Sequence, residues 1–193
     1  MIRLADVRRW YNALSRPSGR QNARRLHERG EDVHSIVFRV GDETDVQELS
    51  ELHVQLWNAT YQTDRGPTVA IRARQWTELF RRKDPREFVV VVEDQSGRMI
   101  GFTVGRPHEG DLEAELAKIY LRWEYHGLGL GRRMMAVTAQ RFLERGVQSF
   151  ILFADRSNPT IGFYDRMGGE RLLDEQGVFR GAYAWRDVRT LLG

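Results

Sequence analysis

Apolar residues alternate with polar ones over some stretches of the chain and recur every three or four positions over others. Alternation with a period of two is typical of a half-buried strand, and recurrence at i, i+3, i+4 and i+7 is typical of an amphipathic helix. Ile36 and Phe38 show the first pattern, and Leu49, Leu52 and Leu56 show the second. Both patterns can be followed to the end of the chain, so they divide it into predicted strands and helices.

The pattern predicts strands over residues 35–40, 88–93, 98–105, 113–122, 147–153, 170–173 and 178–187. It predicts helices over residues 45–61, 68–82, 129–145 and 159–167. The order is β-α-α-β-β-β-α-β-α-β-β. This order predicts an α/β domain of the α+β kind with a mixed sheet, because a doubly wound nucleotide-binding fold would alternate strand and helix strictly.

The first 34 residues read as a helical appendage, residues 1–34, attached to a domain over residues 35–193. Leu4, Val7, Tyr11 and Leu14 follow a helical period, and residues 21–29 predict a second helix that Gly30 ends. Either the main domain or a partner subunit in a homodimer could bury these helices. Acidic residues interrupt the arginines of this segment, so we expect solvated helix faces and not a nucleic-acid contact.

Composition removes several classes of protein. The 193 residues fit one domain, with 41% hydrophobic and 30% charged residues. The chain has no cysteine and its histidines do not cluster, so we expect no disulfide, no thiolate zinc site and no metal. A net charge of +3 does not call for nucleic acid. No apolar run approaches the ~20 residues that span a membrane, and no secretory signal is visible, so we expect a cytoplasmic protein with no membrane partner.

The most informative stretch is Tyr-His-Gly-Leu-Gly-Leu-Gly-Arg-Arg over residues 125–133, between a predicted strand and a predicted helix. Alternating glycines let backbone N–H groups turn toward one point, and the helix start adds unpaired N–H groups and a positive dipole end. Together these make a nest for a phosphate. The loop is neither a Walker A motif nor a complete dinucleotide-binding G-x-G-x-x-G fingerprint.

The residues around this loop resemble those of a known family. The stretch Glu115–Gly131 resembles the acyl-CoA motif of the GNAT acetyltransferases, a strand ending in Leu/Ile-Tyr-Val followed by Arg/Gln-x-x-Gly-x-Gly/Ala, with His126 at the Arg/Gln position. The stretch Asn158–Gly168 resembles that family's Asn…Phe-Tyr-x-x-x-Gly segment. The spacing from Asn158 to Tyr164 is one residue shorter than usual, which makes Ser157 an alternative for the asparagine's place.

The resemblance implies a GNAT-like three-layer domain, in which helices flank a mixed, mostly antiparallel sheet and splayed central strands hold acyl-CoA. It implies acetyl-CoA as co-substrate. Backbone groups of Ile119, Tyr120 and Leu121 would pair with the pantetheine arm, and Asn158 would touch it. The pyrophosphate would lie on the loop residues His126, Gly127, Leu128, Gly129, Leu130, Gly131 and Arg132. Arg133 would reach either a phosphate or solvent.

The resemblance also implies a reaction, N-acetyl transfer to a primary amine of an unidentified small molecule. A typical amine has a pKa near ~10, so a positioned base is needed to deprotonate it and a positioned acid to protonate the leaving thiolate. Tyr164 would be the acid. Glu115 is our candidate base, with Glu113 or an ordered water as alternatives. Strict alternation would place Glu115, Ala117, Ile119 and Leu121 on one face of the strand.

Two other functions remain open. The acceptor could be a peptide or a tRNA-linked amine, or the chain could be a non-catalytic acyl-CoA-binding module. Phe153 stands where GNAT enzymes that modify the N-terminus of a ribosomal protein carry glutamate, which disfavours that subclass. Trp57 and Tyr61, Trp76 and Phe80, and Asp64 are candidates to line the acceptor pocket. Because the resemblance begins only at Ser35, we expect residues 1–34 to be dispensable for cofactor binding.

Overall fold

The computed structural model describes residues 18–156 and 158–193. The helix predicted from Leu4 to Leu14 and the alternative residue Ser157 lie outside the described residues. From residue 35 onward every predicted strand and helix is present, with each end within three residues of its predicted position. None of the helices in the described part of the chain is long and apolar enough to cross a membrane.

The centre of the molecule is one seven-stranded sheet with the strand order β1-β2-β3-β4-β5-β7-β6. Its strands are β1 (Val37–Val40), β2 (Phe88–Glu93), β3 (Met99–Pro107), β4 (Ala114–Leu121), β5 (Phe150–Phe153), β6 (Glu170–Leu173) and β7 (Phe179–Trp185). All neighbours are antiparallel except β4 and β5, which run parallel. The predicted mixed, mostly antiparallel sheet is confirmed.

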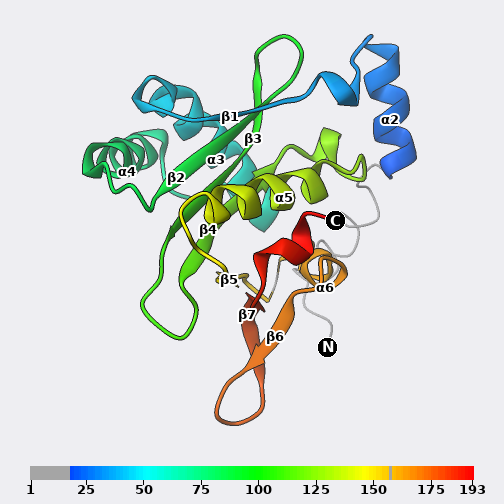
Figure 1. Cartoon of the computed structure of the whole chain (residues 1–193). Coiled ribbons are helices and arrows are strands. Elements are labelled where there is room, and N and C mark those ends of the chain that lie inside the picture. The colour runs from blue at the N-terminus through cyan, green and yellow to red at the C-terminus, as the bar shows by residue number, and fades with distance from the viewer. Residues whose placement is uncertain (1–17, 157) are drawn as a thin grey trace.

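Helices cover both faces of the sheet and complete three layers (Figure 1). On one face, α3 (Val46–Tyr61) and α4 (Val69–Arg82) bury Leu49, Leu52 and Trp76 against β2 and β3. On the other face, α5 (Leu130–Leu143) and α6 (Gly162–Arg166) pack on β4, β5 and β7. The helical period of the apolar residues therefore turns one side of each long helix toward the sheet.

The parallel pair β4–β5 is short, and it opens the sheet. Only Ala114 and Glu115 of β4 are paired with β5, at Phe150 and Ile151. Beyond Glu115 the two strands separate, so one backbone edge of β4 is left without a neighbouring strand. An unpaired edge presents N–H and C=O groups that an extended ligand can bind, which fits the predicted splay of the central strands.

The described part of the segment before β1 packs into the core, which argues against the expectation that residues 1–34 are dispensable for cofactor binding. The helix α2 (Gly19–Glu28) begins at a capping box formed by Ser18 and Gln21. It inserts Leu26, which is 3% exposed, among the side chains of Ile36, Val92, Tyr125 and others. The amphipathic pattern predicted the helix, but it could not say which surface the helix covers. Figure 1 shows α2 beside the loop that leads into α5.

Replacing Leu26 with alanine is therefore expected to destabilise the whole domain. The substitution removes three carbon atoms from a closed apolar cluster, which lowers the free energy of unfolding by about 2–5 kcal/mol. Leu173→Ala on β6 is the matched control, because Leu173 is 60% exposed and its loss should change that free energy by less than about 0.5 kcal/mol. Urea denaturation measures the free energy of unfolding of both variants. Equal, small changes in the two would show that α2 does not contribute to the stability of the domain.

Candidate functional site

The glycine loop combines left-handed backbone conformations with an uncapped helix start. Gly127 and Gly129 have φ values of 74° and 79°, a left-handed conformation that favours glycine. Gly129 is the N-cap of α5, and no side chain caps that helix end. The first N–H groups of α5 therefore lack an intrahelical acceptor and carry the positive end of the helix dipole. The loop therefore has the two features on which the predicted anion nest depends, left-handed glycines and an uncapped helix start.

Helix α2 holds this loop in place, a contact that sequence reasoning missed. The amide Nδ2 of Asn22 donates to the backbone oxygens of Trp123, at 2.8 Å, and of His126, at 2.9 Å. Gly19 and Gly127 pack backbone to backbone, since a Cβ built on Gly19 would lie 2.6 Å from the oxygen of Gly127. Asn22 is fully buried. No local sequence pattern links residues that lie so far apart along the chain.

His126 occupies the corner between β4 and the loop. Its Nε2 lies 3.0 Å from the oxygen of Leu121, and because a carbonyl only accepts, this nitrogen carries the proton. The imidazole packs against the Trp123 ring with centroids 4.2 Å apart. The histidine thus fixes the turn that leads from the strand edge to the nest.

A groove of about 420 Å³ begins at the nest and runs between α5 and α6. The predicted residues His126, Gly127, Gly129, Gly131 and Arg132 line it, together with Arg166, Phe163 and Met134. Arg132 and Arg166 are exposed. Arg166 lies inside the second motif at a position the motif leaves open, so sequence reasoning missed it.

Arg133 does not line the groove, and it contacts the segment before β1. Its guanidinium donates to the backbone oxygens of Val33, at 3.1 Å, and Ile36, at 3.3 Å, and lies over the Phe38 ring. This arginine therefore ties the N-terminal segment to α5.

A second, smaller cavity of about 90 Å³ lies where β4 and β5 separate. Its walls include the predicted pantetheine residues Ile119, Tyr120, Leu121 and Asn158, and also Tyr164. Asn158 accepts hydrogen bonds from the N–H and the hydroxyl of Thr160 through its Oδ1. Tyr164, His126 and Ile119 line this cavity and the groove alike, so the two form one path from the nest to the splayed strands.

Tyr164 is a titratable group at the meeting point of the groove and the cavity, as is His126. The residue is 5% exposed, and burial, with smaller effects of Tyr120 and Tyr61, raises the pKa of its phenol well above the usual value near 10. Within residues 18–156 and 158–193 its hydroxyl makes no hydrogen bond. The phenol is therefore protonated at neutral pH and is able to donate a hydrogen bond into the path.

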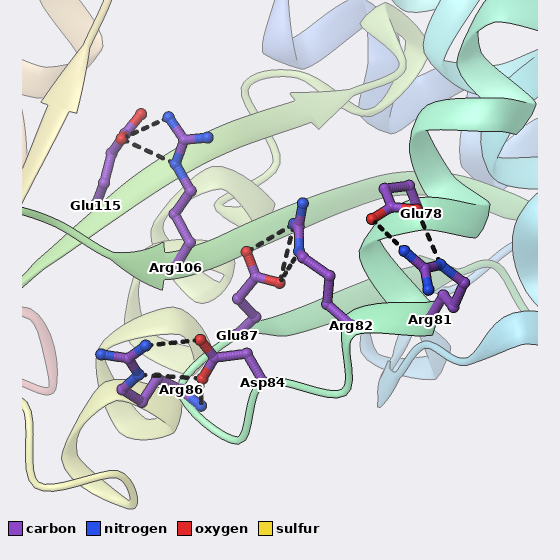
Figure 2. Close-up of polar contacts among 8 residues, drawn as sticks. All are labelled: Glu78, Arg81, Arg82, Asp84, Arg86, Glu87, Arg106 and Glu115. Atoms are coloured by element: carbon purple, nitrogen blue, oxygen red, sulfur yellow. Dashed lines mark hydrogen bonds and ion pairs between the residues drawn. The ribbon is translucent and has the colours of Figure 1, made fainter.

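Glu115 lies at the last residue pair before the strands separate. One carboxylate oxygen, Oε2, accepts from Nη2 and Nε of Arg106 at 2.7 and 2.9 Å (Figure 2). The other oxygen makes no hydrogen bond to the described residues. Glu113, the alternative base, instead accepts from the backbone N–H groups of Gln148 and Ser149, so it is engaged in holding the start of β5.

A β-bulge in β4 breaks the strict alternation assumed from the sequence. Gly105 of β3 pairs with Leu116 while Val104 pairs with Lys118, so Ala117 is the extra residue. Ala117 and Tyr120 therefore pack on the α3–α4 side, whereas Ile119 packs toward α5. Since the neighbours of Glu115 in β4 face α5, Glu115 shares the α3–α4 side with Ala117 and Tyr120, not with Ile119.

The aromatic candidates for the acceptor pocket separate into two groups. Trp76 and Phe80 belong to the core between α4 and the sheet. Tyr61, whose ring lies 4.8 Å from that of Trp57, lines the cavity between the splayed strands. Phe153 also lines this cavity and is 58% exposed.

Asp64 is exposed and lines none of the three cavities described for this molecule. In the described part of the chain, no three histidine, aspartate or glutamate side chains gather as a metal site would require.

Known proteins resemble the chain along most of its length. A Bacillus subtilis protein named "uncharacterized N-acetyltransferase YuaI" is 27% identical over 167 residues, which cover 81% of this chain and 96% of the relative. The mycothiol acetyltransferase of an Arthrobacter strain is 29% identical over 93 residues, 46% of this chain but only 28% of that enzyme.

Solved structures share the fold at lower identity. The PaiA N-acetyltransferase of Thermoplasma acidophilum, in complex with coenzyme A, superposes with a TM-score of 0.61 at 18% identity over 78% of this chain and 98% of that one. The YncA putative acetyltransferase of Salmonella typhimurium, with acetyl-CoA, gives 0.58 at 17% identity over 78% and 93% of the two chains. The sequence profile of the acetyltransferase (GNAT) family matches residues 46–169. The chain belongs to the acetyltransferase (GNAT) family.

Proposed function

We propose that the protein transfers an acetyl group from acetyl-CoA to a primary amine of a small molecule. The observation that carries this proposal is the continuous path from the glycine nest to the point where β4 and β5 separate, with Tyr164 lining both parts. A nest that binds phosphate, an open strand edge that binds an extended amide chain, and an acid at the far end match the three parts of an acyl-CoA.

The binding of acetyl-CoA is assigned to backbone groups for the most part. The N–H groups of residues 127–132 would hold the pyrophosphate, with Arg132 and Arg166 at the rim of the groove. The free edge of β4 at Ile119–Leu121 would pair with the pantetheine arm, and Asn158 would contact that arm from the opposite wall. His126 would brace the corner between the two. Structures related to this one contain coenzyme A or acetyl-CoA, which supports the assignment.

Two side chains would move protons. Tyr164 would donate to the thiolate sulfur as the thioester opens, because its phenol is protonated and its side chain lines the path. Glu115 would accept the amine proton through its oxygen that Arg106 leaves free, either directly or through a water. The bulge at Ala117 would leave backbone N–H groups out of the strand ladder, where they could stabilise negative charge on the carbonyl oxygen.

Glu115→Gln is expected to change the pH dependence of the reaction. The amide keeps the volume and can still accept from Arg106, but it cannot take a proton from the amine. The rise of kcat on the acid side of the pH–rate profile should therefore disappear, and kcat should fall by roughly 10²–10⁴-fold. Glu113→Gln is the matched control and should leave the profile in place. An unchanged acid side in Glu115→Gln would assign the base to an ordered water.

A small acceptor fits the relatives better than a macromolecule does. One relative is named a mycothiol acetyltransferase, and an aminoglycoside 6'-acetyltransferase shares the fold with a TM-score of 0.54. Both names refer to small molecules.

A panel of acceptors tests the proposal. Small amines, amino acids, peptides and aminoacyl-tRNA are each incubated with acetyl-CoA while free CoA thiol is measured. We expect thiol release that depends on a small amine. Release only with peptides would change the acceptor class, release only with aminoacyl-tRNA would indicate a tRNA-linked amine, and no release in the presence of measurable acetyl-CoA binding would indicate a non-catalytic binding module.

A further inference from the structure

A third cavity, of about 470 Å³, lies on the α3–α4 side of the sheet, opposite the groove along α5. We call it the cationic pocket and define it by His53, Arg72, Trp76, Arg82, Arg106 and Lys118. No residue of the glycine loop lines it. Ala117 and Lys118 line both this pocket and the cavity between the splayed strands, so the two spaces meet at the bulge of β4.

Ion pairs already neutralise some of the arginines around the pocket. Arg82 binds Glu87 at 2.8 Å, and Arg106 binds Glu115 at 2.7 Å (Figure 2). Arg81, the residue before Arg82 in α4, binds Glu78. In each of these pairs a carboxylate balances the charge of the guanidinium, so these arginines attract a further small anion only weakly.

Arg72 and Lys118 have no such partner. Among the described residues neither forms an ion pair with a carboxylate, and Lys118 makes no hydrogen bond. Arg72 is only 8% exposed and donates to the neutral side chain of Gln75 at 2.9 Å. Two cations, one from α4 and one from β4, thus line one cavity without a carboxylate in direct contact, whereas its carboxylates Glu78 and Glu87 are paired with other arginines. This arrangement favours an anion.

Three buried nitrogen atoms in the same wall also lack partners in the described part of the chain. They are Nε of Arg72, Nε1 of Trp76 and Nδ1 of His53, and each of these side chains is more than nine-tenths buried. The arginine and indole nitrogens are donors that lose their hydrogen bonds to water on folding. Oxygen atoms of a ligand in the pocket would supply the missing acceptors.

The positive potential of the pocket is visible in its titratable groups. Burial, followed by the charges of Arg72 and Lys118, lowers the pKa of His53 to about 2, so this imidazole stays neutral. Burial, followed by the charges of Arg106 and Arg72, lowers the pKa of Lys118, against a smaller opposite effect of Glu115. A bound anion would relieve this repulsion, because an opposite charge nearby favours the charged form of the lysine.

We propose that the cationic pocket binds a carboxylate or phosphate group of the acceptor, so that the acceptor is an amine that also carries an anionic group. The anion would lie between Arg72 and Lys118, and the amine would reach the bulge of β4 beside Glu115. This inference rests on the proposed acetyl transfer. It is distinct from the phosphate nest, because the pocket and the glycine loop have no lining residue in common.

Anion binding can be tested without any reaction. Wild-type protein is titrated with inorganic phosphate and, separately, with succinate, while the ¹H–¹⁵N signal of the Trp76 indole is followed and assigned with Trp76→Phe. We expect a saturable shift with at least one anion, and the anion that saturates identifies phosphate or carboxylate as the preferred group. Lys118→Met should weaken the binding about 10- to 100-fold, because it removes a charge-assisted hydrogen bond.

The chain offers a matched control, since Lys83 is its only other lysine and is exposed. Lys83→Met makes the same change of net charge outside the pocket and should leave the affinity unchanged. If Lys118→Met does not fold, Arg72→Met takes its place. No saturable shift with either anion, or equal weakening in Lys83→Met and Lys118→Met, would overturn the proposal.

A second experiment compares acceptors in matched pairs, phosphoethanolamine with ethanolamine and β-alanine with its amide. We expect the anionic member to have the higher kcat/KM in at least one pair, and Lys118→Met to abolish that preference through KM. A preference for the uncharged or cationic member in both pairs would overturn the pocket assignment while leaving acetyl transfer intact. Anion binding without transfer to any amine would support the pocket and count against the proposed function.

Discussion

Gly129→Glu is expected to abolish acetyl-CoA binding in a protein that remains folded. Gly129 lines the groove and is the N-cap of α5, with φ of 79° and no atom within 4 Å of a Cβ built on it. The new side chain therefore has room, but it places a carboxylate where the pyrophosphate would lie on the helix N-terminus. Repulsion between the two anions replaces the attraction of the nest.

The expected loss is at least about 100-fold in affinity by calorimetry, which corresponds to about 2.7 kcal/mol. Gly146→Glu is a close control, because Gly146 follows the other end of α5, has φ of 77° and also has no atom within 4 Å of a built Cβ. Both variants impose the same left-handed conformation on glutamate and the same change of charge. Comparable affinity in the two variants would show that the loop is not the phosphate site.

Tyr164→Phe is expected to lower kcat by roughly 10- to 1000-fold with little change in acetyl-CoA affinity. The substitution removes one hydroxyl from a side chain that is otherwise buried against Phe163 and Tyr183. Packing is preserved, and what is lost is the hydroxyl of a side chain that lines the cavity between the splayed strands. The departing thiolate would then leave without a proton donor.

The control for this variant is Tyr183→Phe. Tyr183 is a fully buried tyrosine whose ring centroid lies 5.4 Å from that of Tyr164, and its hydroxyl is bound to Asp165. It lines neither the groove nor the cavity, so its loss should affect stability without lowering kcat tenfold. Normal turnover of Tyr164→Phe on the true acceptor would remove this tyrosine from the mechanism, and an equal loss in both variants would indicate a packing effect.

Sequence periodicity predicted the helices and strands because each buries one side along a regular repeat. The glycine loop could also be predicted from the sequence, since left-handed positions such as Gly127 and Gly129 favour glycine. The side of the sheet on which Glu115 lies could not be predicted. One extra residue at Ala117 inverts the alternation along β4, and no residue type there indicates a bulge. The pattern of apolar residues shows the repeat of a strand, but it does not show where a bulge shifts that repeat by one residue.

Contacts between distant segments were also beyond the sequence. Nothing near Asn22 indicates that its amide binds the backbone of Trp123 and His126. The cationic pocket could not be predicted for the same reason, since Arg72 and Lys118 lie on different elements, and only the folded chain brings them to line one cavity. Both features depend on tertiary packing, which a single sequence does not display.

A crystal structure of the protein with acetyl-CoA would show where the cofactor lies. We expect the pyrophosphate on the N–H groups of residues 127–132 and the pantetheine amides paired with β4 at Ile119–Leu121. We also expect the thioester sulfur within hydrogen-bonding distance of the Tyr164 hydroxyl, between the separated ends of β4 and β5. Acetyl-CoA bound outside the groove, or with its sulfur remote from Tyr164, would overturn the proposed acetyl-CoA site.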